Sequence, residues 1–164
     1  MQLAAAAGAR VTATVRNPDL RDQVAAIGSA AGSVEVVAHD DFAGRGPYDV
    51  VLELVGAPNL PDDLRALATG GRIVVIGVGG GAAAELDLLT LMARRGRIQA
   101  STLRPRPLEQ KADAARRVEA HVLPLLAAGR ITVPVAARVP MVEAEAAYER
   151  FAAGGKLGKI VLVR

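Results

Sequence analysis

Short aliphatic runs alternate with amphipathic segments over the first hundred residues of the chain. The runs are typical of buried strands and cover Arg10–Val15, Val34–Ala38, Tyr48–Val55, Arg72–Gly77 and Arg97–Leu103. Helix-like segments separate several of them and are expected over Pro18–Gly28, Leu60–Ala68 and Leu86–Gly96, two of which end at a glycine. This alternation with short links predicts an α/β fold with a parallel, doubly wound sheet.

The pattern changes after Leu103. Arg104–Pro107 interrupts it, and an alanine-rich helix is expected from Leu108 to Ala128, with a kink or an early end at Pro124. A short run, "VPVAARVP", then precedes a helix over Glu143–Gly155 and a closing strand over Gly158–Val163. The C-terminal part of the chain is therefore patterned differently from the first hundred residues.

Composition narrows the class of protein. Apolar residues make up 51% of the chain and aromatic residues only 2%, so the core must be built from Ala, Val, Leu and Ile. There is no cysteine, which excludes disulfides and thiolate metal sites and fits a reducing compartment. No run reaches the roughly 20 apolar residues of a membrane span, and the start has no basic region followed by a long apolar one. We expect a cytoplasmic protein without a membrane partner.

Charge and histidine content exclude two further classes of site. The net charge of +3 comes from arginines scattered along the chain, without a basic stripe or interleaved aromatic residues, so no nucleic-acid partner is expected. His39 and His121 have no metal-ligand spacing, and no metal site is predicted.

One stretch matches the dinucleotide-binding fingerprint G-x-G-x-x-G/A: Gly77 to Ala82, after a predicted strand. A phosphate loop should lead directly into a helix, whereas here alanines, Glu85 and Asp87 intervene, and their carboxylates would repel a phosphate. At least three strands also precede the stretch. The favoured interpretation is a loop at the carboxyl end of a later strand, where glycines let the backbone approach a ligand. The true fingerprint and a turn without a ligand stay open as alternatives.

Two other polar features have structural interpretations. Glu53 lies in the middle of an aliphatic strand and is expected to be a buried carboxylate satisfied by a neighbouring loop rather than a catalytic base. The stretch "GGKLGK", with Lys156 and Lys159, resembles a phosphate loop in composition, but Ile160 stands where Ser or Thr is required. A turn before the closing strand is favoured there.

The segments "QLAAAAGARVTATVRNPD", "GPYDVVLELVG", "GGRIVVIG", "RIQASTLRPRP", "VLPLLAAGRI" and "AAYERFAAGGKLGKIVLV" occur in an order that resembles a known family. The chain resembles the C-terminal half of a medium-chain dehydrogenase/reductase of the quinone-oxidoreductase, or zinc-binding alcohol dehydrogenase, type. The resemblance implies that residues 1–128 form a partial NAD(P)-binding Rossmann domain. Residues 129–164 would then complete the catalytic domain.

The resemblance also implies that something is missing. The family places a strand, the glycine fingerprint and a catalytic domain before the position of Met1, so we expect an N-terminally truncated chain with Met1 as an internal methionine. In the strand order 3-2-1-4-5-6 the absent strand is number 1, at the sheet centre. The Arg10–Val15 and Val34–Ala38 pair should therefore not bond to Tyr48–Val55 and Arg72–Gly77. Two strand edges without hydrogen-bond partners inside an apolar layer are unfavourable. We therefore expect a chain of marginal stability that closes the gap by re-pairing its strands or by association.

Cofactor-binding residues follow from the same resemblance. Arg16 and Asn17 end the first predicted strand, where an arginine accommodates the 2′-phosphate of NADP; an ordinary exposed arginine is the alternative. The crevice residues that would line the ribose and nicotinamide are Val55, Gly56, Ile76, Gly77, Val78 and Leu103. Packing at the sheet end is the alternative role for most of them. No catalytic residue is assigned.

The predicted function is the cofactor-binding half of an NADPH-dependent oxidoreductase. Hydride would pass to a small quinone, enone or carbonyl substrate, or between alcohol and aldehyde, without zinc in this chain. The outermost strand, Arg97–Leu103, is expected to pair with its mate in a homodimer. The alternatives are a truncated non-catalytic remnant or dimerisation module, and another doubly wound protein such as a methyltransferase, which would require an acid near Arg16.

Overall fold

The computed structural model describes all 164 residues, which form two compact units. Unit 1 contains Met1–His39 and Arg116–Arg164, and unit 2 contains Asp40–Ala115. The strands lie in three separate sheets, and every strand pair is parallel. The molecule is thus an α/β protein, as the alternation of strand-like and helix-like segments predicts.

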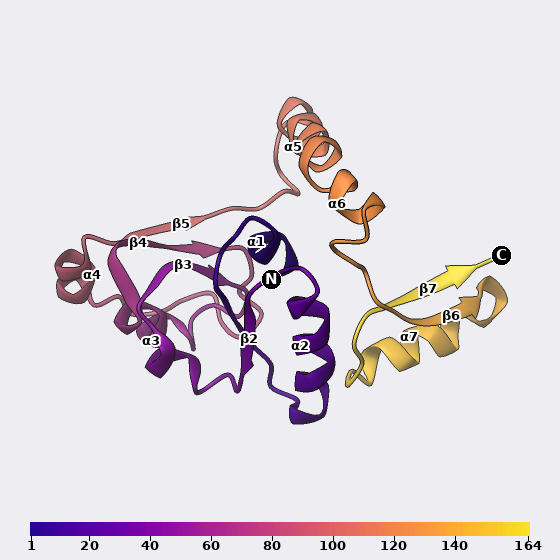
Figure 1. Cartoon of the computed structure of the whole chain (residues 1–164), viewed down its shortest axis with the longest axis horizontal. Coiled ribbons are helices and arrows are strands. Elements are labelled where there is room, and N and C mark those ends of the chain that lie inside the picture. Colours follow the sequence, from indigo (N-terminus) through magenta and orange to yellow (C-terminus); the bar gives the residue numbers. More distant parts are fainter. The chain divides into compact units, whose positions relative to one another are not determined.

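Unit 2 is built on a three-stranded parallel sheet in the order β3-β4-β5 (Figure 1). Its strands are β3 (Tyr48–Glu53), β4 (Leu67–Val75) and β5 (Arg97–Ala100). The short helices α3 (Leu60–Arg65) and α4 (Leu88–Arg94) connect them, after the 3-10 turn η2 (Phe42–Arg45). Each strand is followed by a helix that returns the chain to the start of the next strand, which is the connection that parallel pairing requires.

The core of unit 2 lies between α3 and the central strand. Leu64, Leu67 and Ile73 are at most 2% exposed, and Val51, Val75, Leu91 and Ile98 are among the side chains that pack against them. β4 is paired on both edges, and this explains why its aliphatic run is the most deeply buried. The sheet therefore holds the ends of its three strands in fixed register.

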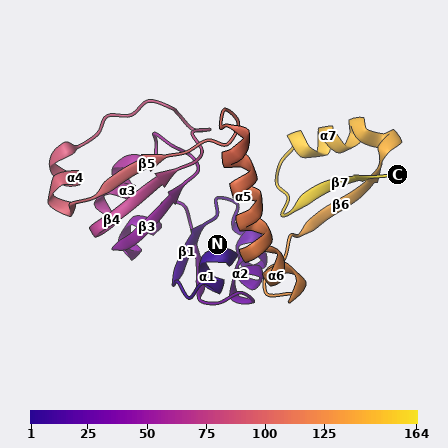
Figure 2. The ribbon, with the colours of Figure 1, turned by 90° about the horizontal axis from the view of Figure 1, so that it is seen from above.

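Unit 1 contains two βαβ arrangements. In the first, β1 (Val11–Thr14) and β2 (Val34–Val37) pair in parallel, and η1 (Pro18–Leu20) and α2 (Arg21–Ser29) connect them. In the second, β6 (Val135–Pro140) and β7 (Lys159–Val163) pair in parallel (Figure 2). The chain between these two strands forms η3 (Met141–Glu143) and α7 (Ala144–Ala152). The remaining helices are α1 (Gln2–Ala6), α5 (Leu108–His121) and α6 (Leu123–Ala127).

Segments far apart in the sequence close the core of unit 1. Ala5, Ala31 and Ile131 are buried together. Gln2 makes two bonds with Thr132, since its Nε2 donates to the carbonyl and its Oε1 accepts from the amide, both at 2.8 Å. The first helix is therefore tied to the segment after α6.

The separation of the sheets confirms the prediction about strand pairing. β1 bonds only to β2, and β3 bonds only to β4, so one edge of each strand has no partner strand. The break between α5 and α6 at Val122 likewise confirms the predicted interruption near Pro124. The closing strand begins at Lys159 after Gly158, which has a φ of +105°, so the turn interpretation of "GGKLGK" is also confirmed.

Two predicted boundaries are wrong. The predicted strand Arg97–Leu103 ends at Ala100, because the backbone turns at residues 103–106. The predicted helix Leu60–Ala68 ends at Arg65, because Leu67 already pairs with Tyr48 in the sheet and is fully buried. The division at residue 128 stays a prediction. No helix combines the length and the apolar character needed to cross a membrane.

Candidate functional site

The carboxyl ends of β3, β4 and β5 meet at one edge of the sheet in unit 2. Because the three strands are parallel, Glu53, Val75 and Ala100 end them on the same side, and the loops that follow emerge there. In open α/β sheets, ligands bind in the crevice outside these ends. Six of the eight residues predicted to bind the cofactor lie on these loops: Val55, Gly56, Ile76, Gly77, Val78 and Leu103.

The loops after β3 and β4 are bonded to each other. Gly56 and Gly81 form a parallel β-bridge. The amide of Ala57 donates to the carbonyl of Gly81 at 3.0 Å, and the amide of Gly80 donates to the carbonyl of Val55 at 2.8 Å. Gly56 has a φ of +99°, and a Cβ there would lie 2.5 Å from the Gly81 oxygen. This close approach requires glycine at position 56.

The glycine stretch Gly77–Ala82 belongs to this crevice and does not open a helix. A Cβ on Gly77 would lie 2.4 Å from the carbonyl oxygen of Leu54, so this glycine is needed for contact with the loop after β3. α4 begins only at Leu88, where Asp87 accepts a bond from the amide of Thr90 at 3.0 Å. The fingerprint interpretation is therefore wrong, because no helix N-terminus follows the glycines directly.

Glu53 is 3% exposed and binds the backbone of the loop after β3. Its Oε1 accepts bonds from the amides of Val55 and Gly56, the latter at 2.7 Å, and its Oε2 accepts from Asn59 Nδ2 at 3.2 Å. Burial raises the pKa of Glu53, but these bonds and one with Asp63 outweigh it and hold the pKa below its ordinary value. The prediction of a buried carboxylate satisfied by a neighbouring loop is confirmed.

A second buried carboxyl group lies beside Glu53. Asp63, in α3, is 1% exposed, and its Oδ2 has no hydrogen-bond partner. Burial, the hydrogen bond with Glu53 and the charge of Glu53 raise the pKa of Asp63 to about 8. The sequence does not single out Asp63, because two aspartates in the first turn of a helix suit the helix dipole and need no other explanation.

Apolar side chains are exposed on the loops after β3 and β4. Val55 is 42% exposed, and Ile76 and Val78 are each 50% exposed. A Cβ on Gly79 would meet no atom within 4 Å. The loops thus offer exposed apolar side chains beside a backbone held in place, which are common features of small-molecule sites.

Leu103 lies in the turn after β5 and is 58% exposed. Arg106 holds this segment, since its Nε donates to the carbonyl of Thr102 at 2.9 Å and its Nη2 donates to the Ser101 hydroxyl. The amide of Ser101 donates to the carbonyl of Val75 at 3.1 Å, so the end of β5 stays beside the end of β4.

The other two predicted residues belong to unit 1, at the carboxyl end of β1. Arg16 is exposed. Asn17 caps the next turn, because its Oδ1 accepts a bond from the amide of Asp19 at 3.0 Å. The side-chain oxygen of Asn17 thus has a structural role. Arg16 lies just after the carboxyl end of β1 and is exposed to solvent.

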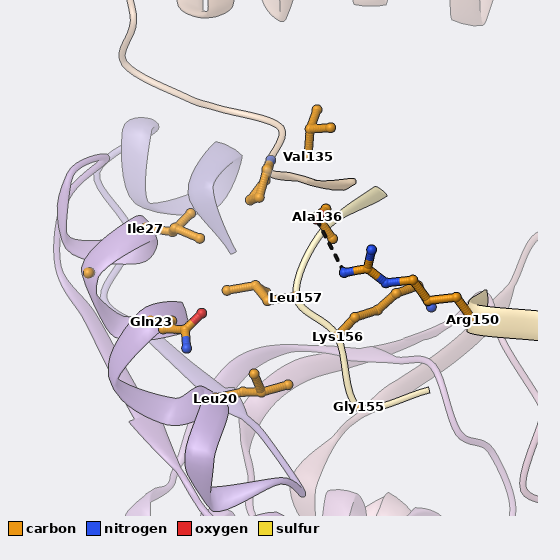
Figure 3. Close-up of a pocket in the computed structure, with 11 residues that line it drawn as sticks. Leu20, Gln23, Ile27, Val135, Ala136, Arg150, Gly155, Lys156 and Leu157 are labelled. Atoms are coloured by element: carbon orange, nitrogen blue, oxygen red, sulfur yellow. Dashed lines mark hydrogen bonds between the residues drawn. The ribbon is translucent and has the colours of Figure 1, made fainter. Parts of the chain in front are cut away.

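Unit 1 also has an open hollow beside α2 (Figure 3). It encloses about 730 Å³ and is lined by Leu20, Gln23, Ala26, Ile27, Pro134, Val135, Ala136, Arg150, Gly155, Lys156 and Leu157. Both cations already have partners, since Arg150 donates to the Ala136 carbonyl at 3.5 Å and Lys156 donates to the Phe151 carbonyl at 3.3 Å. No polar side chain is buried in this hollow.

No three His, Cys, Asp or Glu side chains lie close enough together to hold a metal ion. The residues of this chain therefore do not fit a zinc site.

Comparison with known proteins links the chain to one family. A family model described as "zinc-binding dehydrogenase" matches residues 30–162. The acryloyl-coenzyme A reductase of Metallosphaera sedula is 29% identical over 163 residues, which are 99% of this chain and 46% of that protein. The quinone oxidoreductase of Rattus norvegicus is 28% identical over 122 residues, 74% of this chain and 35% of that protein. The chain spans less than half the length of these curated relatives.

Solved structures show the same relation. The quinone oxidoreductase of Thermus thermophilus, solved also as its complex with NADPH, is 29% identical and superposes with a TM-score of 0.78. The match covers 99% of this chain and 52% of that one. The fold of this chain is thus that of the cofactor-binding half of such enzymes.

Proposed function

Because the chain belongs to the zinc-binding dehydrogenase family, we propose that it is the NADPH-binding part of an oxidoreductase. The observation that carries the proposal is a pair of bonded loops at the carboxyl edge of a parallel sheet, which present Val55, Ile76 and Val78 to solvent. Support comes from the Thermus thermophilus relative, whose complex with NADPH was solved.

The roles of the residues follow from their chemistry. Val55, Ile76 and Val78 would pack against the apolar parts of the nicotinamide end, and the open space at Gly79 would admit the ligand. The exposed guanidinium of Arg16 would pair with the 2′-phosphate, which distinguishes NADPH from NADH. The bound cofactor supplies hydride, and the protein supplies orientation and exclusion of water. The substrate would be a small electron-poor carbonyl, quinone or alkene.

Calorimetry with NADPH tests this function, and the chain offers a matched control. Arg16 and Arg10 are both exposed arginines, but Arg16 follows the carboxyl end of β1 and Arg10 precedes its amino end. Since a hydrogen-bonded charged pair contributes about 1.5–3 kcal/mol, Arg16→Ala should weaken NADPH binding about 10- to 100-fold. NADH binding should not change, and neither should NADPH binding by Arg10→Ala.

The alternative is a non-catalytic remnant or dimerisation module. The edges of β1 and β3 that have no partner strand favour it, because the crevice would then be incomplete. Absence of NADPH binding at millimolar cofactor would refute the cofactor proposal and leave this alternative.

We also propose that β5 pairs with a second copy of itself. One edge of β5 bonds to β4, and the other has no partner strand. The Ser101 amide points to β4, so by alternation the amide of Ala100 points outward. Ala100→Pro removes that outward donor while keeping the bonds to β4. Light scattering should find dimers for the unmodified chain and monomers for Ala100→Pro; equal masses would contradict the proposal.

A further inference from the structure

The buried pair of carboxyl groups beneath the crevice is not explained by cofactor binding alone. Glu53 ends β3 and Asp63 lies in α3, ten residues later, and both are more than nine-tenths buried. The two side chains lie close enough for a hydrogen bond between their carboxyl groups. Two carboxylates cannot share such a bond, because neither has a proton to donate.

The contacts of Glu53 decide which group carries the proton. Its two oxygens accept from the amides of Val55 and Gly56 and from the side chain of Asn59. All three partners are donors, and they favour an ionised Glu53. The proton must therefore be on Asp63, whose remaining oxygen, Oδ2, has no partner in its buried position.

The elements around the pair carry further charged groups. They are Arg45 of η2, Asp49 of β3, Asp62 and Arg65 of α3, Arg72 of β4, Asp87 before α4 and Arg94 of α4. Asp62 and Arg65 form an ion pair with each other, and Arg94 donates to the Arg65 carbonyl at 3.0 Å. The charge of Glu53 raises the pKa of Asp63. A proton on Asp63 neutralises that carboxyl group.

We propose that Asp63 is a positioning residue: as a neutral acid it donates to Glu53, which in turn holds the amides of Val55 and Gly56 and so keeps the crevice loop closed. The effect on cofactor binding rests on the proposed function, whereas the effect on the loop does not. The proposal adds a residue of α3, buried and out of reach of any ligand, to the determinants of the crevice.

The proposal implies a direction of pH dependence. The pKa of Asp63 is about 8 in the closed loop, against an ordinary value of 3.8. A carboxyl group whose pKa is raised in the closed loop stabilises that loop fully at pH values below its ordinary pKa. This contribution is lost as the pH rises to the raised pKa. Loop opening should therefore become about tenfold more favourable per pH unit between about pH 5 and pH 8, and level off above that. Glu53, with its lowered pKa, acts only in the acid range below this window.

Hydrogen exchange of the Val55 and Gly56 amides in the full chain tests this, with protection corrected for the intrinsic rate at each pH. In the unmodified chain, protection should fall with pH up to about pH 8. In Asp63→Asn, which keeps a neutral donor, protection should not depend on pH in that window. Asp62→Asn, at the neighbouring solvent-accessible aspartate, should behave as the unmodified chain does.

Two further measurements separate the outcomes. Carboxyl-carbon NMR of the unmodified chain should show Asp63 titrating well above the range of ordinary Glu and Asp side chains; titration near its ordinary value would overturn the proposal. If Asp63→Asn does not fold, Asp63→Ser provides a smaller neutral donor for the same exchange experiment.

NADPH affinity should decline over the same pH window only in the unmodified chain and Asp62→Asn. If no variant binds NADPH, the proposed function fails, while exchange and NMR still decide the role of Asp63.

Discussion

Gly56 offers the sharpest test of how the two crevice loops are held together. Its φ of +99° lies in a region that side chains rarely adopt, and an alanine Cβ would lie 2.5 Å from the Gly81 oxygen and 3.0 Å from the Val78 Cα. Both neighbours are backbone atoms and cannot rotate away. Gly56→Ala must therefore separate the loops or strain the backbone.

The expected cost can be added up from these contacts. The left-handed conformation costs an alanine about 1–2 kcal/mol. Separating the loops would also break the bond from the Ala57 amide to Gly81, worth about 1 kcal/mol. We therefore expect Gly56→Ala to lower the free energy of unfolding by about 2–3 kcal/mol, which for a chain of this length is about 4–12 °C in Tm.

Gly79→Ala is the matched control, because it adds the same methyl group to the same pair of loops. Its Cβ would meet no atom within 4 Å, and its φ lies outside the left-handed region. It should change stability by no more than about 0.5 kcal/mol. Thermal unfolding followed by circular dichroism measures both variants. Equal midpoints for the two would refute the argument that the bridge between Gly56 and Gly81 holds the crevice closed.

Further predictions concern stability and association. Ile73→Ala should cost about 2–5 kcal/mol in urea unfolding, because Ile73 is fully buried in the central strand; a loss below about 1 kcal/mol would contradict that packing. Asn17→Ala should cost about 1 kcal/mol and Asn17→Ser much less, since serine also caps; equal losses would argue against the cap. Urea midpoints should fall between about pH 5 and pH 8 in the unmodified chain but not in Asp63→Asn, because folding keeps Asp63 protonated. The unfolding midpoint should rise with protein concentration, because β1 and β3 each have an edge without a partner strand; a cooperative transition in a dilute monomer would refute this.

Several features of the fold could be predicted from local pattern. Aliphatic runs of about four to eight residues are typical of strands, and this pattern predicted β1 to β4 and β7. The end of β5 was not predictable in this way, because Ser101 and Thr102 are as compatible with a strand as with the turn that Arg106 holds. The helix after β3 was predicted too long, since only pairing with Tyr48 shows that Leu67 belongs to the sheet.

For the candidate site, the sequence placed Val55, Gly56, Ile76, Gly77 and Val78 at strand ends, and parallel pairing brings such ends to one edge. It could not distinguish Gly56 and Gly77, which make close backbone contacts, from Gly79, which makes none. That distinction depends on the approach of another loop, which no local pattern records.

The sequence by itself determined that the chain is α/β with parallel strands and that Glu53 is a buried, satisfied carboxylate. These properties follow from periodicity, composition and strand order. Only the tertiary structure decided that the glycine stretch packs on a loop instead of opening a helix, and that Asp63 lies beside Glu53. Both depend on contacts between separate elements, where burial and a neighbouring charge change the chemistry of a residue whose local sequence is ordinary.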